Sequence, residues 1–265
     1  MSNGNQSLQR GLAILSELER AAESLGVREI GRRLDLNPAT TQRLVNTLLE
    51  EGFLARDTER NRYSLGYKAL SLGTSLLNDN RLVSSSMEVL QALTQAMEVN
   101  SFLGSLLGDQ VVYLLSLQSQ GPISINSRTG QPLALHSTAL GKAILAELPE
   151  GRALSLIRAR PLPQFTDRTI TAEDALLEHL HEIRRQGYAT AIGENLTGID
   201  SVGAVVRGSN GQIAGAISAA YAPTLQTGVR FDELTLKIVE AAREISLRLG
   251  CPATALPAER HLAAS

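Results

Sequence analysis

The chain has 265 residues, enough for two domains of ordinary size, and 43% of them are hydrophobic, enough to bury substantial cores. Its formal net charge of -2 argues against a protein that coats polyanions through overall charge, although a local basic surface could still bind DNA. The single cysteine, Cys251, excludes an internal disulfide framework and is typical of a reducing cytoplasm. No apolar run approaches the roughly 18 residues of a membrane span, and the polar start is not that of a signal peptide. The sequence therefore predicts a soluble, cytoplasmic protein that does not bind membranes.

Two short helices are predicted at the beginning of the chain. The apolar positions of the first are Leu8, Leu12, Leu15 and Leu18. They recur at steps of four and three residues, which places them on one face of a helix. The segment 27–35 shows a similar pattern, and only a very short connection separates it from the next predicted helix.

A third helix is predicted over residues 38–51. Asn37 is expected to be its N-cap, because an asparagine side chain accepts hydrogen bonds from the amides left unpaired at a helix start. Pro38 suits the first helical position, where its missing N–H costs no hydrogen bond, and Gly52 is a typical residue after a helix end. The stripe expected to face the core consists of Thr41, Leu44, Val45 and Leu48.

The opposite face of this helix is short, mostly uncharged and rich in hydrogen-bonding groups. Its candidate DNA-binding residues are Ala39, Thr40, Gln42, Arg43 and Asn46. Arginine can bridge O6 and N7 of guanine, glutamine can bridge N6 and N7 of adenine, and threonine can contact a phosphate or a thymine methyl group. Taken alone, such a face is more often a plain solvated surface, so the neighbouring segments must decide between the two interpretations.

A small β-hairpin with a charged tip is predicted directly after this helix, over residues 53–64. Its three arginines, Arg56, Arg60 and Arg62, could clamp the DNA backbone or enter a minor groove. A helix, a tight turn, a capped helix and a basic hairpin follow one another in the order of a winged helix-turn-helix domain. We therefore predict that residues 38–51 and 53–64 bind an operator in double-stranded DNA.

The remainder of the chain mixes helices and strands. A helical stretch follows the hairpin and is interrupted near residues 78–80. The other predicted elements are a hairpin over 101–118, a strand over 123–127, a helix over 138–148, a helix over 171–187, a hairpin over 201–222 that turns at Asn210 and Gly211, and a terminal helix over 231–250. This combination favours an α+β domain with an antiparallel sheet.

The predicted domain organisation follows from these elements. Residues 1–66 would form the winged helix-turn-helix domain and residues 67–82 a linker helix. Residues 83–255 would form the α+β domain, and residues 256–265 a flexible tail.

The order and spacing of several segments match one protein family. In the front half they are QSLQRGLAIL, VREIGRRLDL, TTQRLVNTLLEEGFL and RYSLG, and in the second half PLALHSTALGKAILAELP, IRRQGYA and GQIAGAISAAYAP. On these segments the chain resembles the isocitrate lyase regulator (IclR) family of bacterial transcription factors. The resemblance implies a linker helix used in dimerisation and an effector-binding domain similar to GAF and profilin-like sheets. It also implies homodimers or homotetramers that repress or activate transcription in response to small organic acids, including aromatic ones.

The resemblance also implies an effector pocket. The matching positions are Gly130, Gln131, Ser201, Ser218, Ala191 and Ala220. Amides and hydroxyls at the first four could bind a carboxylate without a full positive charge, or they could merely form turns and satisfy strand ends. Ala191 stands at an acidic position of an acid-binding member and Ala220 at a serine position. Fewer polar anchors imply a less polar or larger effector than a two- or three-carbon keto acid.

The recognition helix matches the family pattern only in part. Thr40, Arg43 and Leu44 agree with it, whereas the opening Asn37-Pro38-Ala39 departs from the family's proline-lysine-serine-like form. DNA recognition is expected to survive this departure, but the resemblance leaves the operator sequence open.

A phosphate-binding loop over residues 130–142 is excluded. His136 stands where the first glycine of such a loop is required, and Ala143 replaces the serine or threonine that would hold magnesium. Lys142 is therefore expected to cap a helix or to face solvent. The neighbouring Ser137 or Thr138 is expected to be a helix N-cap.

Enzyme chemistry finds little support in the sequence. His179 and His181 lie two residues apart on a predicted helix and so point to different faces, which does not favour a metal site. With no paired acid and base either, we predict no catalytic residue, no cofactor and no metal. The competing interpretation is a metabolite-binding protein or small-molecule enzyme whose front domain serves only assembly.

Overall fold

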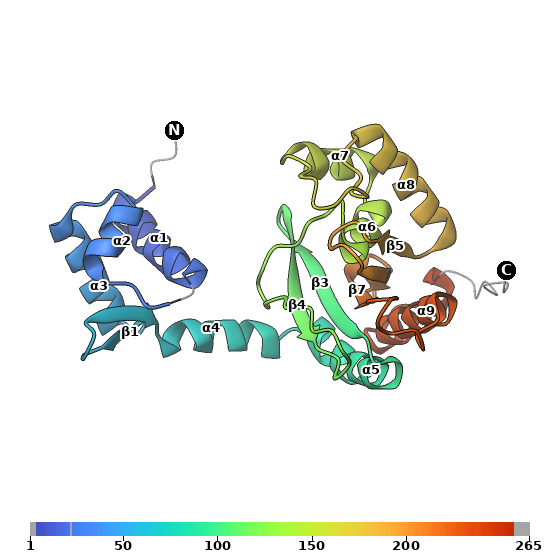
Figure 1. Cartoon of the computed structure of the whole chain (residues 1–265), viewed down its shortest axis with the longest axis horizontal. Helices are drawn as coiled ribbons and strands as arrows, with labels where there is room; N and C mark the ends of the chain where they lie inside the picture. The colour runs from blue at the N-terminus through green and yellow to red at the C-terminus, as the bar shows by residue number, and fades with distance from the viewer. Residues whose placement is uncertain (1–3, 22, 257–265) are drawn as a thin grey trace. The chain divides into compact units, whose positions relative to one another are not determined.

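The computed structural model describes residues 4–21 and 23–256 (Figure 1). The chain forms two compact units that divide between Asp79 and Asn80. This division coincides with the predicted interruption of the helical stretch, because Asn80 is the N-cap of the first helix of the second unit. Within the described ranges, no helix is both long and apolar enough to cross a membrane. Of the predicted tail, only Leu256 belongs to the described residues.

The first unit has the predicted helix-turn-helix followed by a hairpin wing. Its elements are α1 (Gln6–Arg20), α2 (Val27–Arg33), α3 (Pro38–Glu50), β1 (Leu54–Asp57), β2 (Arg62–Leu65) and α4 (Tyr67–Asn78). The two strands pair in an antiparallel manner. One buried cluster joins the elements from α1 to β2, and it consists of Ile14, Leu18, Leu25, Ile30, Val45, Leu54 and Tyr63.

Helix α3 begins and ends as its sequence predicts. The side chain of Asn37 accepts a hydrogen bond from the amide of Thr40 at 2.8 Å, and Pro38 occupies the first turn. Gly52 follows the helix with a φ of +76°, a left-handed conformation that glycine adopts without strain. Thr41, the fourth residue of α3, is fully buried against α2, where a Cβ on Gly31 would lie 3.0 Å from its hydroxyl oxygen. This close approach brings the two helices together.

The described part of the second unit contains a five-stranded antiparallel sheet. Its strands are β3 (Asn100–Leu107), β4 (Gln110–Leu117), β5 (Ala189–Ile192), β6 (Asp200–Arg207) and β7 (Ile213–Tyr221), in the order β4-β3-β7-β6-β5. The long hairpins β3–β4 and β6–β7 are those predicted from the sequence, and the second turns through Asn210 and Gly211. Pairing of β3 with β7 joins the two hairpins into one sheet.

Helices cover both faces of this sheet (Figure 1). They are α5 (Arg81–Met97), α6 (Ala139–Glu147), α7 (Glu150–Arg158), α8 (Glu173–Gln186) and α9 (Phe231–Arg248), and a short 3-10 turn (Ala253–Ala255) follows. Gly104 of β3 pairs with Ala216 of β7, and Gly215 precedes Ala216. Gly104 lies against Leu140 of α6, whereas Gly215 lies against Leu82 of α5. Because successive strand residues point to opposite faces, α5 and α6 lie on opposite sides of the sheet.

One local prediction differs from the structure, and two elements of the structure were not predicted. The segment 123–127 is not a strand, because the side chain of Asn100 takes the place of a strand neighbour. It donates to the carbonyl of Ile123 at 3.1 Å and accepts from the amide of Ile125 at 3.3 Å. Helix α7 and strand β5 were not predicted; β5 has only four residues, too few to show a period on its own.

Candidate functional site

The exposed face of α3 is the first candidate site. Ala39, Gln42, Arg43 and Asn46 are exposed, and Thr40 is half-buried beside the N-cap. The amide of Gln42 donates to Asn46 at 2.8 Å, so these two side chains form one polar surface along the helix. The guanidinium of Arg43 makes no hydrogen bond or ion pair with any described residue, which leaves it available to a partner outside the chain.

The three arginines of the hairpin wing lie in different environments. Arg60 is exposed at the tip, where the carboxylate of Asp57 accepts from its amide at 3.1 Å. Arg56 is also exposed and donates to the side chain of Asn61 at 2.8 Å, with its guanidinium 6.0 Å from the centroid of the Tyr63 ring. Both side chains reach solvent from a fixed backbone.

Arg62 faces the body of the unit instead. Its Nε donates to the carbonyl of Ser24 at 2.5 Å, and its Nη2 lies 3.3 Å from the carboxylate of Glu29 on α2. Glu29 also binds Arg33 at 2.7 Å, and this hydrogen bond holds the pKa of the Glu29 carboxyl below its usual value. The guanidinium of Arg62 therefore fastens the wing to α2 and is not available in the way that those of Arg56 and Arg60 are.

A pocket of about 310 Å³ in the second unit is the second candidate site. Five of the six predicted effector positions line it, namely Gln131, Ala191, Ser201, Ser218 and Ala220. They come from β5, β6, β7 and the loop before α6, so the sheet and α6 enclose the space together. Gly130 does not line the pocket; with a φ of +85°, it forms the turn that leads to Gln131.

The other lining residues give the pocket an apolar character with a few polar groups. Its aromatic members, Phe102, Tyr113 and Phe165, were not predicted, and burial raises the pKa of the Tyr113 phenol. Thr138 and Ala139 place the beginning of α6 at the pocket. The remaining members are Ile125, Asn126, Ser127, Pro132, Leu133, Ala134, Leu140, Asn195, Leu196 and Ile199. No charged side chain is among the lining residues, so a bound anion would depend on hydroxyls, amides and the helix N-terminus.

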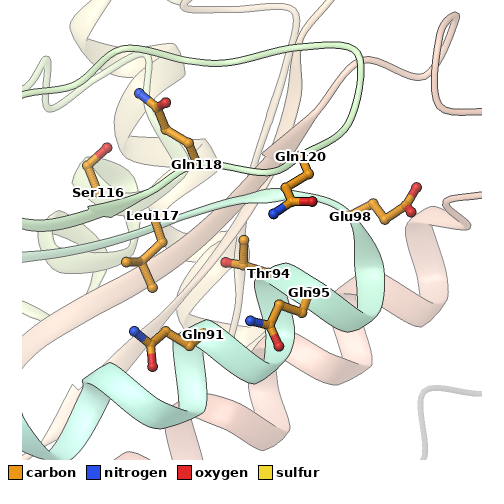
Figure 2. Close-up of a pocket in the computed structure, with 8 residues that line it drawn as sticks. All are labelled: Gln91, Thr94, Gln95, Glu98, Ser116, Leu117, Gln118 and Gln120. Atoms are coloured by element: carbon orange, nitrogen blue, oxygen red, sulfur yellow. The ribbon is translucent and has the colours of Figure 1, made fainter.

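A larger hollow of about 630 Å³ lies between α5 and the end of β4 (Figure 2). None of the predicted effector positions lines it. The residues around it are Gln91, Thr94, Gln95, Glu98, Ser116, Leu117, Gln118 and Gln120. This lining offers one carboxylate, no cation and one hydrophobic side chain, which suits an organic acid poorly. The smaller pocket is therefore the candidate effector site.

Lys142 contradicts its prediction, because it neither caps a helix nor faces solvent. Its side chain is fully buried, and its Nζ lies 2.7 Å from both carboxylate oxygens of Glu194 and 3.2 Å from Nε2 of His179. Burial lowers the pKa of Lys142, while Glu194 acts in the opposite direction. The sequence held a signal for this burial: Lys142 is the only polar side chain between Ala139 and Ala146, so that stretch has no face suited to water.

The two histidines of α8 point to different faces, as predicted. His179 is half-buried at Lys142, and His181 is exposed. Among the described residues, no group of three or more histidine, cysteine, aspartate or glutamate side chains could hold a metal ion. The contact that His179 makes is with Lys142, where Nε2 can accept from the ammonium group in the tautomer that carries its proton on Nδ1.

Known protein families match both units. Residues 7–58 match the IclR helix-turn-helix domain, and residues 74–247 match the bacterial transcriptional regulator IclR C-terminal domain. The chain belongs to the IclR family. It is thus a DNA-binding transcriptional regulator with a C-terminal effector domain, and the interpretation as an enzyme is set aside.

Individual relatives agree with this assignment along nearly the whole chain. The HTH-type transcriptional regulator BhcR of Paracoccus denitrificans is 32% identical over 246 residues, which are 92% of this chain and 88% of the relative. The regulator KdgR of Escherichia coli is 29% identical and covers 92% of each chain. The crystal structure of Thermotoga maritima IclR has 28% identity and a TM-score of 0.76, covering 92% of this chain and 98% of the other. An IclR regulator from Alicyclobacillus acidocaldarius has 26% identity and a TM-score of 0.79, covering 93% and 98%.

The environment of His179 predicts a specific loss of stability in acid. Burial first, and then the charge of Lys142, lower the pKa of His179 in the folded chain. Below about pH 6.5 the unfolded chain takes up a proton that the folded chain resists, so stability falls until the pH passes the folded pKa. His179→Gln keeps an acceptor but does not titrate. We expect its free energy of unfolding to fall less than that of the wild type between about pH 7 and pH 5, by at most about 1.4 kcal/mol per pH unit.

Urea unfolding followed by far-ultraviolet circular dichroism measures this difference. His181→Gln is the matched control, because it removes an exposed histidine from the same helix and should behave as the wild type does. Parallel loss of stability in the wild type and His179→Gln would show that the contact with Lys142 does not resist protonation.

Proposed function

We propose that this IclR-family regulator reads its operator through the exposed face of α3 and that a small organic acid with an aromatic or similarly apolar body binds the pocket beside α6. Five predicted effector positions meeting in one uncharged, partly aromatic pocket are the observation that supports the effector class. The binding energy would come from burial of the apolar body and from charge-assisted hydrogen bonds to the carboxylate.

The interface with DNA would combine base contacts and phosphate contacts. Arg43, Gln42 and Asn46 lie on one exposed face of α3 and suit base edges in a major groove. Arg56 and Arg60 on the wing suit phosphates or a minor groove. Arg62 is left out of this interface because its guanidinium binds Ser24 and Glu29.

Self-association would place two reading heads on one operator. Not one of the described residues of α4 is buried, although the helix carries Tyr67, Leu70, Leu72 and Leu76, which are 53–76% exposed. An exposed apolar surface of this kind marks an interaction site, and a second copy of α4 would cover it. Heads separated by about 34 Å, or a multiple of it, would then fit a palindromic operator.

The effector would act by differential affinity. Binding favours one arrangement of the two units over another, and that preference limits the change in operator affinity. A compound that binds both arrangements equally would change nothing, however tightly it binds.

Arg43→Ala should weaken operator binding by about 1–3 kcal/mol, because a bidentate contact to guanine would be lost. A gel shift on the DNA upstream of the regulator's own gene measures the loss. Arg160→Ala, which removes an exposed arginine from the second unit, should bind this DNA as the wild type does. Equal affinity of Arg43→Ala and the wild type would exclude Arg43 from the reading face.

The double substitution Leu72→Glu/Leu76→Glu should convert the assembly to monomers, because four-residue spacing places both charges on one side of α4. Sedimentation equilibrium measures the molar mass. Ser71→Glu/Ser75→Glu adds the same charges to exposed polar positions of the same helix and should leave the assembly intact. An unchanged mass for the leucine variant would rule out α4 as the contact between copies.

Ser218→Ala should weaken the binding of benzoate, the simplest aromatic carboxylate, by roughly two- to tenfold, the effect of one hydrogen bond of about 0.5–1.5 kcal/mol. Calorimetry measures benzoate binding, and a gel shift shows whether operator affinity is kept. Ser101→Ala is the control, because Ser101 is buried in the same sheet but does not line the pocket. Equal losses of benzoate and operator affinity would indicate general damage and reject the proposed role.

A further inference from the structure

Two loops carry one part of the pocket wall. Phe165 belongs to the loop that precedes α8, and Asn195 and Leu196 belong to the loop between β5 and β6. Phe165 is 49% exposed and Leu196 is 46% exposed, so burial alone fixes neither side chain, and the Phe165 ring has one packing contact, a stacking on buried His136 with the centroids 5.8 Å apart. The position of this wall must therefore be set by other contacts of the two loops.

We propose that the buried ion pair between Lys142 and Glu194 is the anchor that positions both loops and so sets the affinity of the pocket for its effector. Neither residue lines the pocket, so both would act as positioning residues. The part of this inference that concerns affinity rests on the proposed effector site, whereas the anchoring of the loops does not.

The first step of the argument is that Glu194 is held by both its side chain and its backbone. Each carboxylate oxygen lies 2.7 Å from Nζ of Lys142, and one of them also accepts from the amide of Ile192 at 3.3 Å. The backbone carbonyl of Glu194 accepts from the hydroxyl of Thr169 at 2.6 Å. Glu194, the second residue of the β5–β6 loop, is thus fixed both to α6 and to the other loop.

The second step is that the loop carrying Phe165 converges on the same point. The hydroxyl oxygen of Thr169 accepts from the amides of Phe165 at 3.0 Å and Thr166 at 2.9 Å, while donating to Glu194. The hydroxyl of Thr166 donates to the carbonyl of Gly193 at 2.7 Å. Movement of Glu194 would therefore loosen both loops at this point, while His136 keeps its separate contact with the carbonyl of Pro163 at 2.9 Å.

The third step is that Lys142 and Glu194 cannot easily separate. The Lys142 side chain is fully buried and that of Glu194 is 10% exposed, so separating the pair would leave a charge in an apolar environment. The next residue, Asn195, accepts from the hydroxyl of Ser137 at 2.8 Å, just before α6. The loop is consequently aligned with the beginning of α6, the helix end that faces the pocket.

The test uses the full-length chain and the double variant Lys142→Met/Glu194→Gln. This variant removes both charges while nearly keeping the side-chain volumes, so it should fold where a single substitution would leave one charge buried and unpaired. The matched control is Glu147→Gln, which breaks the ion pair between Glu147 and Arg207 at the other end of α6, away from both loops.

Two measurements are needed. Hydrogen–deuterium exchange of peptides covering residues 163–170 and 193–199 reports on the loops, with peptides from β6 and β7 as internal references. Titration calorimetry with benzoate reports on the pocket. In the double variant we expect exchange in both loops to rise about tenfold, exchange in β6 and β7 to stay the same, and benzoate affinity to fall about tenfold. Glu147→Gln should match the wild type in both measurements.

Wild-type exchange rates in both loops of the double variant would overturn the inference. So would faster loop exchange with unchanged benzoate affinity, because the anchor would then not set the shape of the pocket. If the wild-type chain does not bind benzoate, the proposed effector class fails, and the exchange result alone decides whether the ion pair anchors the loops.

Discussion

The second unit depends on the fully buried charge of Lys142. Eight of the nine residues of α6 are buried, and one of them is Lys142. A cation at that place must be neutralised from inside the protein, because an isolated buried charge is very unfavourable. Glu194 supplies the opposite charge and brings the β5–β6 loop with it. The course of that loop therefore depends on a charge in α6 as well as on Glu194 in its own sequence.

Helix α6 therefore has two roles that follow from its position between the sheet and α8. Its beginning, at Thr138 and Ala139, lies at the pocket, and Lys142, about one turn later, holds the loop that completes the pocket wall. Both contacts belong to one rigid element, so the geometry of the pocket and the position of the loop are linked. Under the proposed function, an effector that fits the pocket also fits the loop position that Lys142 sets.

Under the proposed function, the first unit must keep the DNA-reading face of α3 polar and exposed while the helix itself stays fixed. Helix α3 is fixed from its other side, where Thr41 and Val45 are fully buried. The arginines of the wing likewise fall into one that holds the fold and two that are exposed. Arg62 binds α2 and holds the hairpin in place, which leaves Arg56 and Arg60 exposed on a fixed support. A side chain that resembles its neighbours in the sequence can thus have a purely structural role.

The sequence by itself determined the elements whose signals are local. The N-cap at Asn37 and the glycines after α3 and α8 act within a few residues, as do the strand-forming residues of the two long hairpins and the turn at Asn210 and Gly211, and the structure has all of them. The sequence patterns also sufficed for the family and for five of the pocket positions. Tertiary structure alone decided the partners of Lys142 and Arg62 and the irregular path of residues 123–127. Each depends on a partner far along the chain: Glu194 is 52 positions from Lys142, Ser24 is 38 from Arg62, and Asn100 is 23 from Ile123. Periodicity and capping report only on neighbours within about one or two helical turns, so contacts over such separations appear only once the chain has folded.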